Sequence, residues 1–303
     1  MKAIVFEEFG GPEVLRLKET AEPHAGPGQV RLKVAAAGVN ALDYKIRSGW
    51  AEEFFPTVLP AIPGSEVAGT VDEIGEGVTG TAIGDEVVGW SVMGGYAPYA
   101  LVETYAPKPD ALPWESAVAL PVAGETSQRV LNLLELKNGE TLLVNGGAGA
   151  VGSIAVQLAA ARGATVIATG SEASHDFLRE LGATPVTYGE GLVERVRAVA
   201  PQGVDAVFDI AGKGALPDAI ELRGGTTDRV VTIADPAARE LGVVFSGGSM
   251  SADAAENLAE QALLAADGTL RVEVAKVLPL EQAAQAQTLS EEGHVRGKLV
   301  LRV

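Results

Sequence analysis

Cysteine is absent from this chain, and histidine is scarce: His24, His175 and His294 are scattered along 303 residues. Without cysteine there can be no disulfide, no thiol nucleophile and no thiolate-bound metal. The three histidines supply no close cluster of nitrogen ligands. We therefore expect no metal site.

Positive charge is also limited. The chain has 23 Lys and Arg against 40 Asp and Glu, a net charge of -17 at pH 7. A surface with this balance repels nucleic acid and anionic membranes, so we expect neither as a partner. No apolar run approaches the ~20 residues of a membrane span, and the start, MKAIVFEEFGG, lacks the pattern of a signal peptide. The sequence predicts a cytoplasmic protein.

Proline is unevenly distributed, with 11 of 16 residues at or before Pro121. There, short Val-rich runs such as QVRLKVAAAGVN are separated by Gly and Pro, which is typical of an antiparallel, barrel-like domain. From about Thr141, strand-like and helix-periodic runs alternate, which predicts an α/β fold with a doubly wound parallel sheet. The last runs, LRVEVAKVLPL and GKLVLRV, return to strands. We place the barrel domain at 1–118 and 270–303, and the dinucleotide-binding domain at 119–269.

A glycine-rich turn, VNGGAGAVGSIAV, occupies residues 144–156 and gives G-x-G-x-x-G at Gly147, Gly149 and Gly152. It follows an apolar strand and opens a helix with an apolar face. Glycines permit a tight turn and let backbone amides approach a pyrophosphate, to which the helix N-terminus adds partial positive charge. We interpret it as a dinucleotide-binding turn. The alternative is a loop that only eases packing of the helix against the sheet.

A second pattern, GSEVAGTVDEIGEGVTGTAIGDEVVGW, spans residues 64–90. Its glycine, valine and acidic spacing resembles the catalytic-domain signature of the medium-chain dehydrogenase/reductase superfamily. AAGVNALDYKIRSG, GGYAPYALV and GHVRGKLVLRV resemble the zinc-independent quinone oxidoreductase branch. The resemblance covers the whole chain and implies a GroES-like β-barrel domain, a Rossmann domain and NADPH-dependent reduction of quinones or other activated double bonds.

The sequence departs from the zinc alcohol dehydrogenases of that superfamily. Asn40 and Ser65 stand where those relatives place a cysteine and a histidine on catalytic zinc, and the cysteine-rich structural-zinc loop is missing. Without a Lewis acid, an alkoxide lacks its usual stabilisation, which disfavours alcohol oxidation. Hydride addition to a conjugated acceptor needs only orientation and a hydrogen-bond donor for a distant oxygen. We expect hydride transfer to a quinone or an α,β-unsaturated carbonyl (enone).

Three polar residues match positions that face the cleft in similar reductases and are the catalytic candidates: Asn40, Asp43 and Tyr44. The alternatives are turn-forming side chains for the first two and simple packing for the tyrosine. An apolar pocket for a flat hydrophobic acceptor is expected from Trp50, Phe55, Trp90 and Met93, with Phe54 beside them. Ordinary core packing is the alternative for each.

The resemblance implies a set of NADPH-binding positions: Thr126, Gly147, Ala148, Gly149, Ala150, Val151, Gly170, Ser171, Tyr188, Ala211, Ile233, Phe245 and Lys298. NADPH is expected over NADH because Thr169, followed by Gly170 and Ser171, stands where an NAD site usually has a carboxylate. A carboxylate there would repel a 2′-phosphate, whereas the Thr169 hydroxyl could donate to it.

Two other functions remain open from the sequence: an enoyl reductase acting on a carrier-bound acyl chain, and a non-enzymatic NADPH-binding protein. The excess of acidic over basic residues gives little support to docking of an acidic carrier. A homodimer is expected through the strand at residues 242–246, because this strand pairs across the dimer in relatives and would be an exposed apolar edge in a monomer.

Overall fold

The structure, a computed structural model, describes residues 1–92, 94–247 and 250–303. The chain forms two compact units, one of Met1–Val122 with Ala252–Val303 and the other of Ala123–Ser251. None of the helices in these described segments is long and apolar enough to cross a bilayer.

The first unit is built on a curled, mainly antiparallel sheet in the order β13-β14-β3-β4-β5-β6, which an additional β3–β6 pairing folds back on itself. Its elements are β1 (Lys2–Val5), β2 (Arg16–Glu19), β3 (Val30–Val39), α1 (Ala41–Arg47), β4 (Glu66–Ile74), β5 (Glu86–Ser91), β6 (Tyr99–Pro107), α2 (Trp114–Ala117), α9 (Ala254–Ala266), β13 (Val274–Pro279), α10 (Ala283–Glu292) and β14 (Lys298–Arg302). The inward-facing residues of β3, mostly Val and Leu, share the core of this unit with Ala283 and Ala286 of α10. The expected GroES-like barrel, completed by C-terminal strands, is confirmed.

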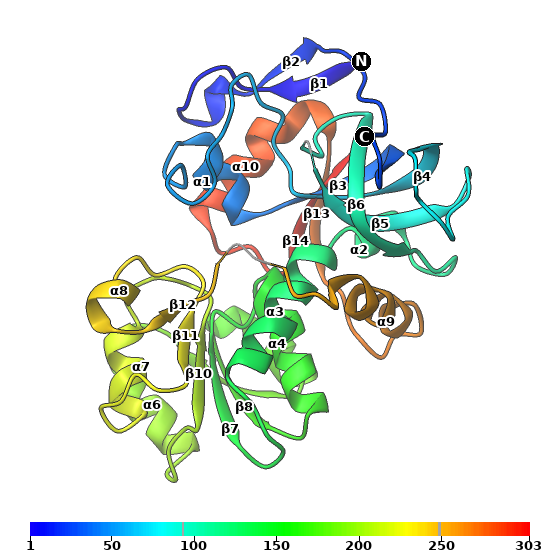
Figure 1. Ribbon diagram of the computed structural model, residues 1–303. Helices are drawn as coiled ribbons and strands as arrows, with labels where there is room; N and C mark the ends of the chain where they lie inside the picture. Colours follow the sequence, from blue (N-terminus) through cyan, green and yellow to red (C-terminus); the bar gives the residue numbers. More distant parts are fainter. Residues whose placement is uncertain (93, 248–249) are drawn as a thin grey trace. The chain divides into compact units, whose positions relative to one another are not determined.

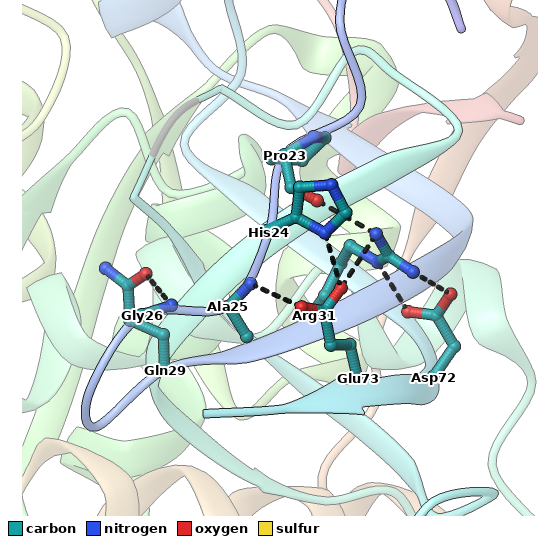
Figure 2. A network of polar contacts seen from close by, with 8 residues as sticks. All are labelled: Pro23, His24, Ala25, Gly26, Gln29, Arg31, Asp72 and Glu73. Atoms are coloured by element: carbon teal, nitrogen blue, oxygen red, sulfur yellow. Dashed lines mark hydrogen bonds and ion pairs between the residues drawn. The ribbon is translucent and has the colours of Figure 1, made fainter. Parts of the chain in front are cut away.

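A polar network fixes the segment that leads into β3 (Figure 2). Arg31 donates from Nε and Nη2 to the two carboxylate oxygens of Asp72, at 3.0 and 2.9 Å, and from Nη1 to the carbonyl of Pro23 at 3.0 Å. Glu73 lies 2.8 Å from the same guanidinium and contacts His24 Nδ1 at 3.2 Å. Because the acidic residues belong to β4, this network ties the chain before β3 to the neighbouring strand.

The second unit contains a six-stranded parallel sheet in the order β12-β11-β10-β7-β8-β9. Figure 1 labels its strands β7, β8, β10, β11 and β12. Its elements are α3 (Pro121–Leu133, whose first two residues count with the first unit), β7 (Thr141–Asn145), α4 (Ala150–Ala161), β8 (Thr165–Gly170), α5 (His175–Glu180), β9 (Ala183–Thr187), α6 (Leu192–Val199), β10 (Ala206–Asp209), α7 (Leu216–Leu222), β11 (Val230–Thr232), α8 (Ala238–Leu241) and β12 (Val244–Phe245). Strand order turns back between β7 and β10, as in a Rossmann fold.

Side chains alternate between the two faces of the buried strands, so each face of the sheet is covered by its own layer of helices. In β7, Leu142 and Val144 pack with α3, α4 and α5, whereas Leu143 packs with α6 and α7 on the other face. Strands buried on both faces are continuously apolar. The apolar run TLLVN could therefore be recognised as a strand from the sequence. The predicted doubly wound sheet is confirmed.

The predicted domain boundary at residue 269 needs correction. Residues 254–266 form α9, which contacts β6 and α2 and so belongs to the first unit. The amphipathic pattern of this helix predicts a buried face but does not say which sheet that face covers. The second boundary therefore lies at Ser251.

Candidate active site

The cofactor candidates gather at one edge of the parallel sheet. The glycine turn follows β7, Gly170 and Ser171 end β8, and Tyr188 follows β9. Ala211 and Ile233 come just after β10 and β11, and Phe245 ends β12. These are the carboxyl ends of parallel strands around the point where strand order reverses, the usual place for a ligand in this architecture. Thr126 lies in α3 and is buried.

The glycine turn contains backbone amides that have no acceptor within α4. Gly147 N donates to the carbonyl of Thr169 at 2.9 Å, and the first intrahelical bond of α4 runs from Ser153 N to Gly149 O at 2.9 Å. The amides between them, from Gly149 to Gly152, therefore lack an acceptor within the helix, as at every helix N-terminus. Among the described residues, a Cβ at Gly149 would meet nothing closer than Gly146 O at 3.9 Å. The turn thus fits a pyrophosphate, because amides without an acceptor in the helix adjoin a space that no described side chain fills.

Gly152 has a different role from Gly149. A Cβ at Gly152 would lie 2.2 Å from Gly146 O and 2.7 Å from Gly147 Cα. Contacts this short are not tolerated, so glycine is required for the helix to start directly under the turn. One glycine of the motif therefore serves the fold, while the other leaves room for a ligand.

A buried polar chain supports the turn from below. Thr169 Oγ1 donates to Asn145 Oδ1 at 2.7 Å, and Asn145 Nδ2 donates to Asp209 Oδ1 at 2.6 Å. Thr232 Oγ1 donates to the other oxygen of Asp209 at 2.6 Å, and Gly146 N donates to Thr169 Oγ1 at 2.9 Å. These hydrogen bonds link β8, β7, β10 and β11. They fix the strand ends from which the predicted cofactor-binding loops begin.

The predicted role of Thr169 is wrong. Its side chain is 1% exposed and its hydroxyl is already bonded to Asn145 and Gly146, so it does not point out of the sheet toward a phosphate. Ser171 is the first partly exposed polar side chain beyond β8, and its hydroxyl lies 3.0 Å from that of Ser174. Ser171, already among the predicted cofactor residues, is therefore better placed than Thr169 for a ribose contact, and that contact stays a prediction.

Arg195, which sequence reasoning did not single out, organises the loop that carries Tyr188. Its guanidinium donates to the carbonyls of Thr187, Gly189 and Glu190 at 2.8 to 2.9 Å. Tyr188 is held between these anchored residues with 47% of its surface exposed. Arg195 lies in α6, one turn after this loop. A basic residue so close to a predicted cofactor loop was the sequence feature that could have pointed to its role.

In the first unit, the catalytic candidates Asn40 and Asp43 lie in a buried network. Asn40, the N-cap of α1, donates its backbone amide to Asp43 Oδ2 at 2.8 Å. Asp43 also accepts from Tyr96 OH at 2.9 Å and from Ser65 Oγ at 3.1 Å. The Asn40 side chain donates to Glu66 Oε1 at 2.8 Å. Tyr96 and Glu66 were not predicted as site residues.

Lys298, predicted as a cofactor contact, also lies in this network of the first unit. Its Nζ donates to Asn40 Oδ1 at 2.6 Å and forms an ion pair with Glu66 Oε1. The second carboxylate oxygen of Glu66 accepts from Val122 N at 2.8 Å. Both charged side chains are almost fully buried, at 1% and 0% exposure.

Burial changes the acidity of the central groups. Desolvation raises the pKa of Asp43 to about 6, against the opposing effects of hydrogen bonds from Asn40 and Tyr96 and of the Lys298 charge. The pKa of Tyr96 is raised well above its usual value, first by burial and then by the Asp43 carboxylate it faces. The tyrosine therefore remains a donor, and the Asp43 carboxyl, with a pKa of about 6, is a much weaker acid than an exposed aspartate.

Tyr44 occupies a different environment from Asn40. It is about half buried, and its pKa is raised by burial and by Glu291, while Arg47 lowers it. Neither of these charged neighbours belongs to the network around Asn40, and among the described residues the Tyr44 side chain makes no hydrogen bond to that network.

The proposed apolar pocket is only partly described. Trp90 pairs with Glu66 across β5 and β4, which places it beside the buried network. Trp50 is 52% exposed, with Lys45 Nζ 5.0 Å from its ring centre, and Phe54 is 64% exposed. Phe55 is partly buried, and Met93 lies outside the described residues.

Two family models match the chain: the alcohol dehydrogenase GroES-like domain at residues 26–110 and the zinc-binding dehydrogenase at 181–301. A rat quinone oxidoreductase is 32% identical over 327 residues, covering 99% of this chain and 97% of that protein. The chain belongs to the medium-chain dehydrogenase/reductase superfamily. A Sulfolobus acidocaldarius NAD-dependent alcohol dehydrogenase is 30% identical to this dehydrogenase/reductase over 357 residues, covering all of both proteins.

Solved structures agree with this assignment. A quinone oxidoreductase from Coxiella burnetii superposes with a TM-score of 0.89 at 34% identity, covering 100% of this chain and 99% of that one. A mycobacterial protein complexed with NADPH gives a TM-score of 0.86 at 30% identity, with both chains covered fully. The protein is therefore an oxidoreductase of this superfamily that binds a nicotinamide cofactor.

One of the two matching family models is named for zinc binding. Asn40 and Ser65 are committed to Glu66, Lys298 and Asp43, and a protonated lysine beside the Asn40 oxygen opposes a cation at that atom. No group of three His, Asp or Glu side chains among residues 1–92, 94–247 and 250–303 could hold a metal ion. These residues do not fit zinc.

Proposed function

We propose that this dehydrogenase/reductase uses NADPH to reduce a quinone or an enone without a metal. The single observation that carries the proposal is the Asn40 amide, held between a buried ammonium and a buried carboxylate at the position where zinc enzymes of the superfamily have a metal ligand. An amide donor can stabilise a distant enolate or quinol oxygen, but it cannot replace zinc in alcohol oxidation.

Each part of the reaction has its own residues. NADPH supplies the hydride when bound. The amides of the glycine turn hold the pyrophosphate, and Arg195 fixes Tyr188 at the sheet edge. The Asn40 amide donates to the substrate oxygen as negative charge develops on it.

The experiment is NADPH oxidation against a panel of small quinones, enones, enoyl thioesters and alcohols with NADP⁺, in the presence and absence of a chelator. We expect turnover of quinones or enones at the same rate with the chelator. Turnover of enoyl thioesters alone would favour an enoyl reductase, and NADPH binding with no turnover would favour a binding protein. Chelator-sensitive alcohol oxidation would contradict the proposal.

NADPH preference is expected to depend on Ser171. Ser171→Asp keeps an oxygen within reach of Ser174 but adds a carboxylate at the end of β8, where it would repel a 2′-phosphate. The NADPH to NADH ratio of kcat/KM should fall at least tenfold, or about 1.4 kcal/mol. Ser171→Ala is the control for losing the hydroxyl alone and should change the ratio less. An unchanged ratio in Ser171→Asp would show that the phosphate lies elsewhere.

A homodimer through β12 is proposed as the working assembly. Val244 and Phe245 form the edge strand of the parallel sheet and are 50% and 42% exposed. Apolar edge strands favour pairing with a second chain. Light scattering at micromolar concentration should give twice the mass of one chain, and Val244→Lys should give one chain mass. Leu263→Lys, at an exposed leucine of α9, is the control that should leave the dimer intact. A monomeric wild type would contradict this assembly.

A further inference from the structure

Glu66 and Lys298 form a buried ion pair, and burying both charges costs desolvation free energy. Both side chains are withdrawn from water, at 0% and 1% exposure. Desolvating two charges offsets much of their attraction, and apolar replacements of such pairs are often as stable or more stable. Packing alone therefore does not account for the pair.

The pair fixes the orientation of one amide. Lys298 Nζ donates to Asn40 Oδ1 at 2.6 Å, and Asn40 Nδ2 donates to Glu66 Oε1 at 2.8 Å. A rotation of the amide by 180° would place its nitrogen against the ammonium and its oxygen against the carboxylate. Both charge-assisted bonds would be lost, so only one orientation is stable.

Among residues 1–92, 94–247 and 250–303, one N–H of Asn40 has no acceptor. An amide nitrogen carries two hydrogens, and Glu66 accepts one of them. Asn40 is partly exposed, whereas both members of the ion pair are buried. The ammonium on the amide oxygen also polarises the group, which strengthens its N–H as a donor.

We infer that Glu66 and Lys298 are positioning residues that aim the second N–H of Asn40 at the substrate oxygen. Hydride addition forms a C–H bond at the acceptor carbon and moves the electron pair of the double bond onto that oxygen. Asn40 stabilises the resulting anion, and a proton from water completes the product. This inference rests on the proposed function and gives Lys298 a different role from a cofactor contact.

The first test separates the two roles of Lys298. Lys298→Met should lower kcat about tenfold, and Asn40→Ala about a hundredfold, with the Kd for NADPH unchanged within about twofold in both. In the Asn40→Ala background, Lys298→Met should change kcat less than about twofold, because the amide it positions is gone. A weaker Kd for NADPH with unchanged kcat, or additive losses in kcat, would overturn the inference.

Two further variants guard against misfolding and nonspecific effects. Glu66→Leu combined with Lys298→Met removes both charges together, so no unpaired charge stays buried, and should show the same loss of kcat. Lys108→Met is the matched control. Lys108 is also a buried lysine, bonded to the carbonyls of Pro109 and Leu112 and paired with Glu86, but it is outside this network. It should leave kcat unchanged.

A readout without turnover separates this inference from the proposed function. p-Nitrophenolate is a redox-inert mimic of the reduced oxygen and should bind the NADP⁺-loaded enzyme, about tenfold more weakly in Asn40→Ala and in Lys298→Met. The double variant should be no weaker than Asn40→Ala. Absent binding, or equal binding by all forms, would overturn the inference. A wild type that binds phenolate in this pattern but reduces no acceptor would overturn only the proposed function.

Discussion

Gly149→Val is expected to weaken NADPH binding about a hundredfold, or about 2.7 kcal/mol, while the Tm stays that of the wild type. Gly149 is the N-cap of α4 with φ -76°, a conformation open to any residue, and in the part of the chain that the structure describes its added Cβ would meet only Gly146 O at 3.9 Å. The fold therefore accepts the side chain. The methyl groups would instead occupy the space in which a pyrophosphate approaches the backbone amides.

Two variants calibrate this result. Gly149→Ala adds one methyl group and should give a smaller loss of affinity. Gly152→Ala should lower the Tm, because its Cβ would lie 2.2 Å from Gly146 O. Titration of NADPH fluorescence and thermal unfolding measure the two effects separately. Wild-type affinity in Gly149→Val would mean that the phosphates bind elsewhere.

The buried carboxyl of Asp43 should make wild-type stability fall as pH rises from about 4 to about 6. In the unfolded chain its pKa is near 3.9, whereas burial raises the folded value to about 6. Between these values the folded protein binds the extra proton, so the contribution of this group is present at low pH and is lost as pH rises. The full change is on the order of 3 kcal/mol.

Asp43→Asn isolates this contribution, since all other side chains titrate in both proteins. Urea unfolding at several pH values between 4 and 7.5 should show the wild type gaining on the variant toward low pH. Loss of bonds from Ser65 and Tyr96 adds an offset that does not depend on pH. A difference that is constant across the range, or that grows with pH, would contradict the elevated pKa.

The sequence predicted the features that depend on local pattern. Runs such as TLLVN, and the glycine turn before an apolar helix, carry enough information to place β7, α4 and the cofactor edge of the sheet. The error at Thr169 was avoidable. Thr169 lies inside β8, a strand whose residues from Val166 onward are buried on both faces, so its hydroxyl needs a partner within the fold.

The Asn40 network could not be predicted in the same way. Lys298 and Asn40 are 258 residues apart and meet because β14 pairs with β3. Glu66 follows Ser65 in a recognisable signature, but nothing in that signature says that its carboxylate points at Asn40. Contacts between residues this distant in sequence are set by sheet pairing and register, which no local periodicity encodes.

The most direct measurement is the transfer of deuterium from NADPH labelled at C4 of the nicotinamide to an enone, with chelator present and the product analysed by mass spectrometry. The account predicts one deuterium on the acceptor carbon, transferred from one face of the nicotinamide only, with a rate that does not respond to zinc. A product without deuterium, or transfer that requires zinc, would contradict it.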